Sequence, residues 1–112
     1  MSTVARFVIR DGPHQVVIPI ETLDYAMAHR GGSMLKAGKT KCRMARTLTA
    51  LAASLPVGFL RVHRSAVVNL DRVRRVELCA GTAHVAILSD GSRVRVSRRH
   101  YRRLCVSLEE GE

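Results

Sequence analysis

The 112-residue sequence has no tryptophan, and aromatic residues make up only 4% of it. Aliphatic side chains must therefore form the core, and the apolar fraction of 46% is ordinary for a folded domain. A chain of about 100–150 residues usually forms one compact domain. We predict a single domain over residues 1–112, with its core between about residues 7 and 108.

Cysteine is also scarce. Cys42, Cys79 and Cys105 are an odd number without a C-x-x-C pair, which excludes a disulfide framework. They are far apart, and no histidine pair has a metal-ligand spacing, so we expect no metal site and no cofactor. Each cysteine has apolar neighbours, which predicts three small buried core residues in a reducing cytosol.

Long apolar runs are missing as well. The first residues, MSTVARFVIRDG, lack the apolar run of a signal peptide. No stretch approaches the roughly 20 apolar residues of a membrane span. We therefore expect a cytoplasmic protein that does not insert into membranes.

Acidic residues are few: nine oppose nineteen basic ones, which gives a net charge of +10. Sixteen of the basic residues are arginines. The guanidinium fork suits phosphates and guanine edges. Such a charge favours nucleic acid as the partner, with an anionic membrane or an acidic protein as alternatives.

Short β-like segments bounded by Gly, Asp and Pro dominate the chain. The Asp11-Gly12-Pro13 turn predicts a hairpin between strands 4–10 and 15–20. Gly31-Gly32 predicts a flexible loop after a third strand. The remaining strands are expected at 23–28, 33–37, 41–45, 73–78, 84–88 and 93–96.

Two helices are expected in this mostly β order. Leucines at helical spacing after a Thr47 cap predict a short middle helix over 47–55, which Pro56 ends. Ser97 can cap a last helix over 98–108, with residues 109–112 as a frayed tail.

Arginines gather in residues 59–75 and 93–104. Arg93 and Arg95 should share the outer face of their strand. The last helix carries a basic stripe of Arg98, Arg99, Arg102 and Arg103. Like charges at this spacing repel, which a bound anion would offset; the alternative is a solvated basic face.

The run FLRVHRSAVVNL at 59–70, the Asp90-Gly91 hairpin and Val96-Ser97-Arg98-Arg99 before a terminal helix resemble the LytTR family of bacterial DNA-binding domains. The likeness extends from about Phe7 to Leu108. It implies an elongated β-β-β fold of about ten short strands with a short middle helix and a C-terminal helix. Loops and turns, rather than a recognition helix, would enter successive major grooves at paired direct repeats.

The resemblance also implies which residues face DNA. Base contacts are expected from three segments, which hold His29 and Arg30, His63 and Arg64, and Arg98 and Arg99. Phosphate contacts are expected from Lys39, Lys41, Arg72 and Arg102. Packing or turn formation is the alternative role for His63 and the favoured role for Ser65 and Asn69.

We therefore expect a sequence-specific, duplex-DNA-binding transcriptional regulator, with a second copy on repeat sites. No receiver domain fits in the few residues before Phe7, which predicts a stand-alone regulator. An enzyme is not expected, because no phosphate loop, nucleophile elbow or carboxylate pair is seen. The alternatives are an interaction protein that pairs with a full-length relative or a sensor partner, and an RNA-binding protein, which the few aromatic residues disfavour.

Overall fold

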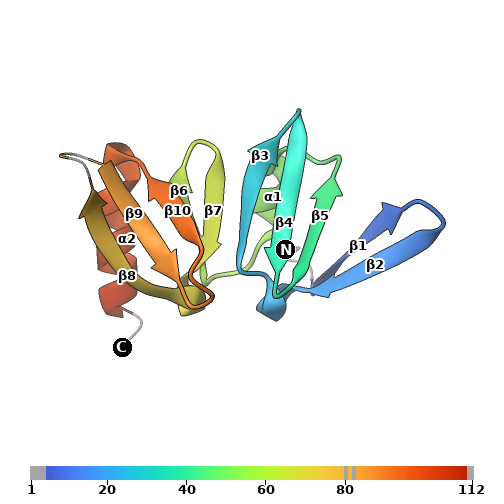
Figure 1. The fold of residues 1–112 in the computed structure, drawn as a ribbon, viewed down its shortest axis with the longest axis horizontal. Coiled ribbons are helices and arrows are strands. Elements are labelled where there is room, and N and C mark those ends of the chain that lie inside the picture. The colour runs from blue at the N-terminus through green and yellow to red at the C-terminus, as the bar shows by residue number, and fades with distance from the viewer. Residues whose placement is uncertain (1–4, 80, 82, 111–112) are drawn as a thin grey trace.

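The computed structural model describes residues 5–79, 81 and 83–110 (Figure 1). The strands are β1 (Arg6–Asp11), β2 (His14–Pro19), β3 (Tyr25–His29), β4 (Gly32–Ala37), β5 (Thr40–Met44), β6 (Phe59–His63), β7 (Ala66–Asn69), β8 (Val73–Cys79), β9 (Ala83–Leu88) and β10 (Arg93–Val96). The α-helices are α1 (Leu48–Ser54) and α2 (Arg98–Glu110), and two 3-10 turns are η1 (Ile20–Thr22) and η2 (Leu70–Arg72).

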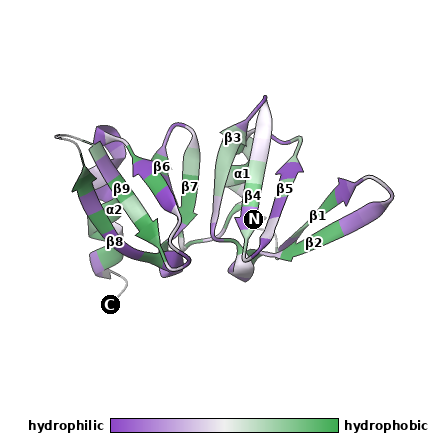
Figure 2. Cartoon of the chain, in the orientation of Figure 1, coloured by the Kyte–Doolittle hydropathy of each residue, from purple (hydrophilic) through white to green (hydrophobic). Residues whose placement is uncertain are grey.

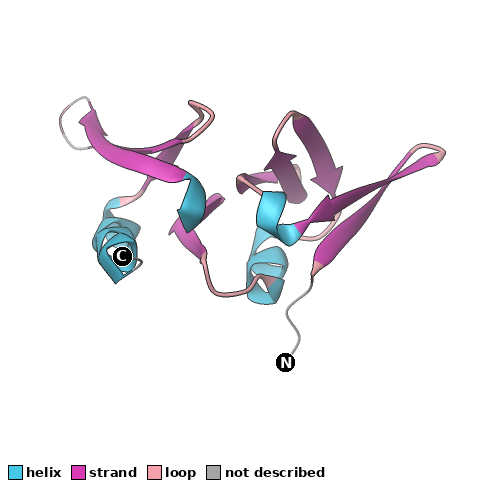
Figure 3. Ribbon diagram, turned by 90° about the horizontal axis from the view of Figure 1, so that it is seen from below, coloured by secondary structure: helices cyan, strands magenta, loops and turns pink. Residues whose placement is uncertain are grey.

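The strands form three sheets: β1-β2, β5-β4-β3-β7-β6 and β10-β9-β8. The molecule is elongated, with extents of 45 × 29 × 23 Å, and both α-helices lie on one side of the sheets (Figures 1 and 3). The expected mostly β fold with three sheets, about ten strands and two helices is confirmed.

Strand β7 separates two hydrophobic cores, and all four of its residues are buried. Val67 points into the first core, while Ala66 and Val68 point into the second. Figure 2 shows apolar residues concentrated in β7 and β9, which contribute to the second core. A strand that is buried on both faces has no alternation of apolar and polar residues, so its pattern alone does not reveal it as a strand.

The first core lies between the central sheet, the β1-β2 hairpin and α1. In β1, Phe7 and Ile9 alternate inward. Helix α1 begins after Thr47, whose side chain accepts the Ala50 N–H, and it buries Leu48 and Leu51. The predicted cap and apolar face of this helix are therefore confirmed.

The second core joins the central sheet to the third sheet and α2. In β10, Val94 and Val96 point inward while Arg93 and Arg95 are exposed, as predicted. Helix α2 packs its apolar face against this core, and Leu104 on that face is fully buried. The helix is also held against β9 by the stacking of Tyr101 on His84, whose ring centroids lie 3.7 Å apart.

Several sequence-based boundaries were wrong. Gly32 is buried at the start of β4 rather than part of a loop. The third strand begins at Tyr25 rather than at residue 23, because Leu23 and Asp24 connect η1 to it. Helix α2 continues through Glu110, so residues 109 and 110 are helical rather than part of the expected frayed tail. Residues 111–112 of that tail and residue 4 of the first predicted strand lie outside the described residues.

The cysteines differ from one another in burial. Cys42 is buried in the first core, as predicted, whereas Cys79 and Cys105 are half-buried. Cys79 ends β8 beside a turn, and Cys105 follows the buried Leu104 on the flank of α2. The prediction of three core cysteines was therefore right for Cys42 and wrong for the other two.

Asp24 ties together the end of the sheet where β3 begins. Its carboxylate accepts the Gly38 N–H at 2.9 Å and lies 3.2 Å from Arg72 Nε and 3.7 Å from Lys36 Nζ. Lys36 also donates to Asp90 in the β9-β10 turn, and this hydrogen bond, together with one from the Ser92 N–H, lowers the pKa of Asp90 to about 2. The network thereby connects the central sheet to the third sheet.

Replacing Asp24 should destabilise the fold. We expect Asp24→Ala to lower the free energy of unfolding by about 1.5–3 kcal/mol, because it removes a charged acceptor from a backbone N–H and from two cations. Urea unfolding at pH 7 measures the change. Asp71→Ala is the control because Asp71 is exposed; an equal loss in both variants would show that the Asp24 network adds no stability.

Candidate nucleic-acid interface

The three segments predicted to face bases lie at one end of the strands. They are the β3-β4 turn, the β6-β7 turn and the start of α2, all along the upper edge in Figure 1. Two backbone hydrogen bonds connect them: Ala28 N–H donates to Ser65 O at 2.9 Å, and Ser97 N–H donates to Val62 O at 2.8 Å. The structure therefore brings together residues that are up to about seventy positions apart in the sequence.

The β3-β4 turn is a tight two-residue connection. Arg30 has φ 48° and Gly31 has φ 78°, the left-handed pair that a type I′ hairpin turn requires. Glycine adopts this conformation freely, but arginine does so at a cost of about 1–3 kcal/mol. The Arg30 side chain is exposed at the tip, and His29 is half-buried below it.

The β6-β7 turn is shaped by its own side chains. Arg64 and Ser65 connect His63 to Ala66, and a register shift in β6 falls between Arg61 and His63. This irregularity leaves the Val62 carbonyl free to accept the Ser97 N–H, which positions the start of α2 beside the turn.

His63 supports the turn and keeps one ring nitrogen available. Its Nδ1 lies 3.1 Å from Ser65 N and 2.8 Å from Ser65 Oγ. Since a backbone N–H can only donate, Nδ1 must accept, and the neutral ring carries its proton on Nε2. Burial, followed by the charges of Arg95 and Arg64, lowers the pKa of His63 below 6.5.

The start of α2 is held in a similar way. The Ser97 carbonyl accepts the N–H groups of His100 and Tyr101, and Ser97 Oγ lies 2.6 Å from His100 Nδ1. Burial and nearby arginines lower the pKa of His100 as well. Arg98 and Arg99 are exposed on the first turn of the helix, where the helix dipole adds to their positive charge.

The exposed arginines of this edge are available for a partner. Within the described part of the chain, Arg30, Arg64, Arg98 and Arg99 take part in no ion pair with a carboxylate. Asp24 and Asp90 lie at the opposite end of the strands. The edge therefore presents positive charge without neighbouring carboxylates from that network.

Comparison with known proteins decides the family. The model of the LytTr DNA-binding domain matches residues 14–109. The chain belongs to the LytTR family. It is 29% identical over 94 residues to the sensory transduction protein LytT of Bacillus subtilis, a match that covers 83% of this chain and 39% of that protein. It is 30% identical over 90 residues to the LytT protein of Bacillus cereus, covering 80% of this chain and 37% of that protein.

A solved structure agrees with this assignment. The LytTr DNA-binding domain of a putative methyl-accepting/DNA response regulator from Bacillus cereus matches with a TM-score of 0.81. At 20% sequence identity, the match covers 91% of this chain and 97% of that chain, and it supports the fold. The chain spans about two fifths of the length of the two LytT proteins.

The LytTR fold places most of the predicted phosphate-contacting residues elsewhere. Lys39 lies in the β4-β5 turn next to Gly38, whose N–H donates to Asp24. Lys41 lies opposite Lys36 in the register of β4 and β5. Arg72 is engaged within the fold by Asp24 and by the Glu21 carbonyl, 3.0 Å away. These three lie toward the end opposite the predicted base contacts, whereas Arg102 is exposed on α2, one turn after Arg98.

Other residues of the LytTR signature serve the fold. The buried Asn69 accepts the Asp71 N–H at 3.0 Å and donates to the Leu23 carbonyl at 2.9 Å, which confirms its predicted turn role. Two arginines that the sequence pattern did not distinguish, Arg43 and Arg61, donate to carbonyls of the two turns. Detecting them requires the cross-strand geometry, because sequence spacing does not specify it.

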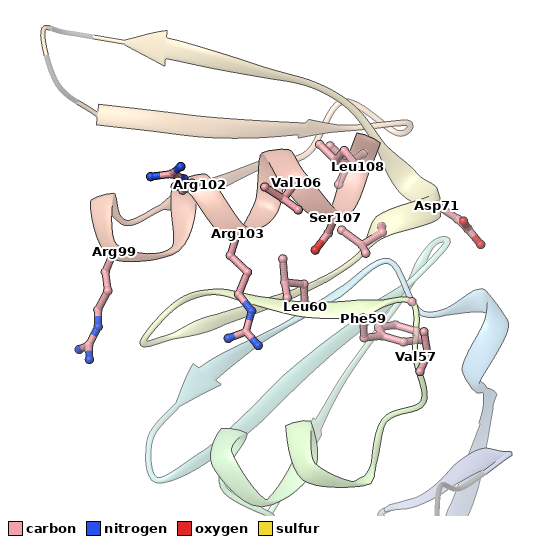
Figure 4. A pocket seen from close by; sticks show the side chains of 13 residues that line it. Val57, Phe59, Leu60, Asp71, Arg99, Arg102, Arg103, Val106, Ser107 and Leu108 are labelled. Carbon is pink, nitrogen blue, oxygen red and sulfur yellow. The ribbon is translucent and has the colours of Figure 1, made fainter. Parts of the chain in front are cut away.

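An open groove of about 1230 Å³ lies beside this edge, between α2 and the segment that contains β6 (Figure 4). Its apolar lining includes Leu60, the fully exposed Val57 and the half-exposed Val106. Arg99 and Arg103 line it toward the start of α2, with Asp71 at the other end. Separately, the described helices are all too short or too polar to cross a membrane.

The pKa of His63 predicts a pH-dependent fold. An unfolded histidine titrates near 6.5, so below that pH the unfolded chain binds protons more readily than the native one. The free energy of unfolding should therefore fall as the pH drops from 7.5 toward the native pKa values of His63 and His100. Imidazole NMR titration combined with urea unfolding measures both effects.

A matched variant isolates the contribution of His63. In His63→Asn, an amide oxygen can accept the Ser65 N–H without titrating, so the loss of stability with acid should be smaller. A native midpoint at or above 6.5 for His63 would contradict the geometry described here.

Proposed function

We propose that this chain is a sequence-specific duplex-DNA-binding domain of a transcriptional regulator. Its two hairpin turns and the start of α2 enter successive major grooves on one side of the duplex, at paired direct repeats. The observation that carries this proposal is the alignment of three exposed, arginine-bearing segments along one edge of a LytTR fold. The role proposed here is recognition, without catalysis.

The dimensions and charge support this mode of binding. The domain is elongated, with a longest extent of 45 Å, and the three segments follow one another along this axis (Figure 1), so they can lie along one side of a duplex. The net charge of +10 favours association with a polyanion. A protein that regulates bacterial transcription works where the chromosome is, which is consistent with the expected cytoplasmic location.

The segments have distinct proposed roles. Arg64 and Arg99 each donate a fork of hydrogen bonds to guanine O6 and N7, and Arg30 and Arg98 are further base contacts. His63 offers its Nε2–H, which follows from the bond at Nδ1, and His29 lies beside the first turn. Arg102 neutralises a phosphate.

We propose that two copies of the domain bind the two repeats. Each copy reads one repeat, and contacts between copies are not needed for this arrangement. Lys39, Lys41 and Arg72 lie toward the far end of the strands, so we assign them at most long-range attraction to DNA.

Selection from random duplex DNA at about 150 mM salt, near physiological ionic strength, tests the proposal directly. We expect enrichment of two short direct repeats on one face of the duplex, separated by a whole number of helical turns of about 10–10.5 base pairs. Folded protein that enriches no sequence, or that prefers single-stranded RNA, would overturn it.

Single substitutions separate base contacts from general attraction. Arg64→Ala and Arg99→Ala should each weaken binding to the selected site by about 1–3 kcal/mol and relax the preference at one position. Lys39→Ala is a matched control that also removes one exposed positive charge, and we expect a much smaller loss from it. Competition binding against random duplex measures the difference; equal losses on both DNAs would refute base contact by these arginines.

The groove favours a second candidate function, docking of a protein partner that modulates DNA binding. Its apolar lining beside Arg99 and Arg103 suits a segment that carries both aliphatic and acidic side chains. Occupation of the groove would mask Arg99, which is one of the proposed base contacts.

A variant in the groove tests this second candidate. Val106→Glu should abolish a complex with a full-length LytTR relative or a sensor protein, because it introduces a charge that repels acidic groups. Leu78→Glu, at an apolar residue exposed on β8, is the control and should retain the complex. Gel filtration of the mixed proteins provides the readout; no complex with wild-type protein would count against partner docking.

A further inference from the structure

We propose that Arg43 and Arg61 are positioning residues, which hold the two hairpin turns in the shape that reads DNA. Each guanidinium donates to a backbone carbonyl of an exposed arginine at a turn. The inference rests on the proposed function, because the turns matter for specificity only if they face bases.

We call each of these guanidinium-to-carbonyl contacts a tie, and the first tie comes from β5. Arg43 Nη2 donates to the Arg30 carbonyl at 2.7 Å, with a second, longer contact of 3.4 Å to the His29 carbonyl. Among the residues that the structure describes, Arg30 is the one non-glycine residue with a positive φ. This conformation needs support from its surroundings. The Arg43 bond supplies that support at the strained residue itself.

Gly32 leaves room for this arrangement. A Cβ built on Gly32 would lie 2.4 Å from Met44 O and 3.0 Å from Arg43 Nη2. Any larger residue would therefore push β5 and the guanidinium away from the turn. This explains why the second glycine of the Gly31-Gly32 pair is buried in a strand, although its sequence suggested a loop.

The second tie comes from β6. Arg61 Nε donates to the His63 carbonyl at 3.1 Å, and its Nη2 donates to the Arg64 carbonyl at 2.5 Å. Both nitrogens of one planar fork are thus used on consecutive carbonyls. A lysine, which carries a compact ammonium on a flexible stem, cannot reproduce this geometry.

The two ties act on the proposed reading residues directly. The bonded carbonyls belong to Arg30 and Arg64, so fixing them restricts the direction in which each side chain leaves the backbone. Fixing a binding group before association reduces the entropy that binding costs. The third segment is already anchored by the bonds of Ser97 and His100.

Direct phosphate contact is the competing role for Arg43 and Arg61, and lysine variants distinguish the two. R43K and R61K keep the charge but lose the fork. If the residues position the turns, each variant should bind the selected site about tenfold more weakly, near 1.4 kcal/mol. Binding to random duplex should change by less than about twofold, and the slope of affinity against salt should be unchanged.

Backbone 15N relaxation provides a readout that does not need DNA. In the wild-type domain, the amides of Arg30, Gly31, Arg64 and Ser65 should be as ordered as those of the strands, with order parameters near 0.85. R43K should loosen the first turn alone, and R61K the second turn alone. R10K, in the distant β1-β2 hairpin, is the matched control and should change neither turn.

The outcomes separate this inference from the proposed function. If wild-type protein selects no DNA sequence, the proposed function fails, and the relaxation data still decide whether the ties order the turns. Wild-type affinity and unchanged turn order in both lysine variants would overturn the positioning role. Equal weakening on selected and random DNA would do so as well, because it would indicate phosphate contact.

Discussion

The pairing of β3 with β7 is the constraint on which the rest of the structure depends. Three residue pairs form it, Tyr25 with Val68, Ala26 with Val67 and Met27 with Ala66, although about forty residues separate the two strands. Because β7 is buried on both faces, a slip of one residue would exchange the side chains of the two cores. The register is therefore strongly specified, and it is this register that places the turns after His29 and His63 next to one another.

The same register divides the molecule into two ends of different electrostatic character. At one end, Asp24 and Asp90 pair with Lys36 and Arg72, so the acids are neutralised within the fold. At the other end, the arginines of the turns and of α2 are exposed. Because the paired acids are remote from this edge, they repel a phosphate backbone there only weakly, since charge interactions decay within about 8–10 Å at physiological salt. The ion pairs that stabilise the fold and the cations available for DNA are thus spatially separated.

Sequence patterns predicted the strands and helices that are specified by residues close together in the chain. Phe7 and Ile9 alternate along β1, leucines repeat along α1, and both helices begin after the residues expected to cap them. The patterns did not delimit β7, because a strand buried on both faces lacks alternation, and they did not delimit β6, in which Val62 is the buried residue and the other four are half-buried. Gly32 was misassigned for a different reason, since a side chain there would meet the Met44 carbonyl and the Arg43 guanidinium of β5, a contact between strands that the local sequence does not show. For the interface, the family likeness indicated the three segments. However, the charges of Lys39 and Arg72 could not reveal which end of the sheet they occupy.

Protection of guanine N7 from methylation on a selected site tests the central claim most directly. The account predicts that the domain shields guanines in successive major grooves, about 10 base pairs apart and on one face of the duplex. Arg30→Ala, in the turn at one end of the edge, should remove protection in one groove, and Arg99→Ala, at the start of α2 at the other end, in another. Protection confined to a single groove, or spread over both faces of the duplex, would contradict the reading of DNA by three aligned segments.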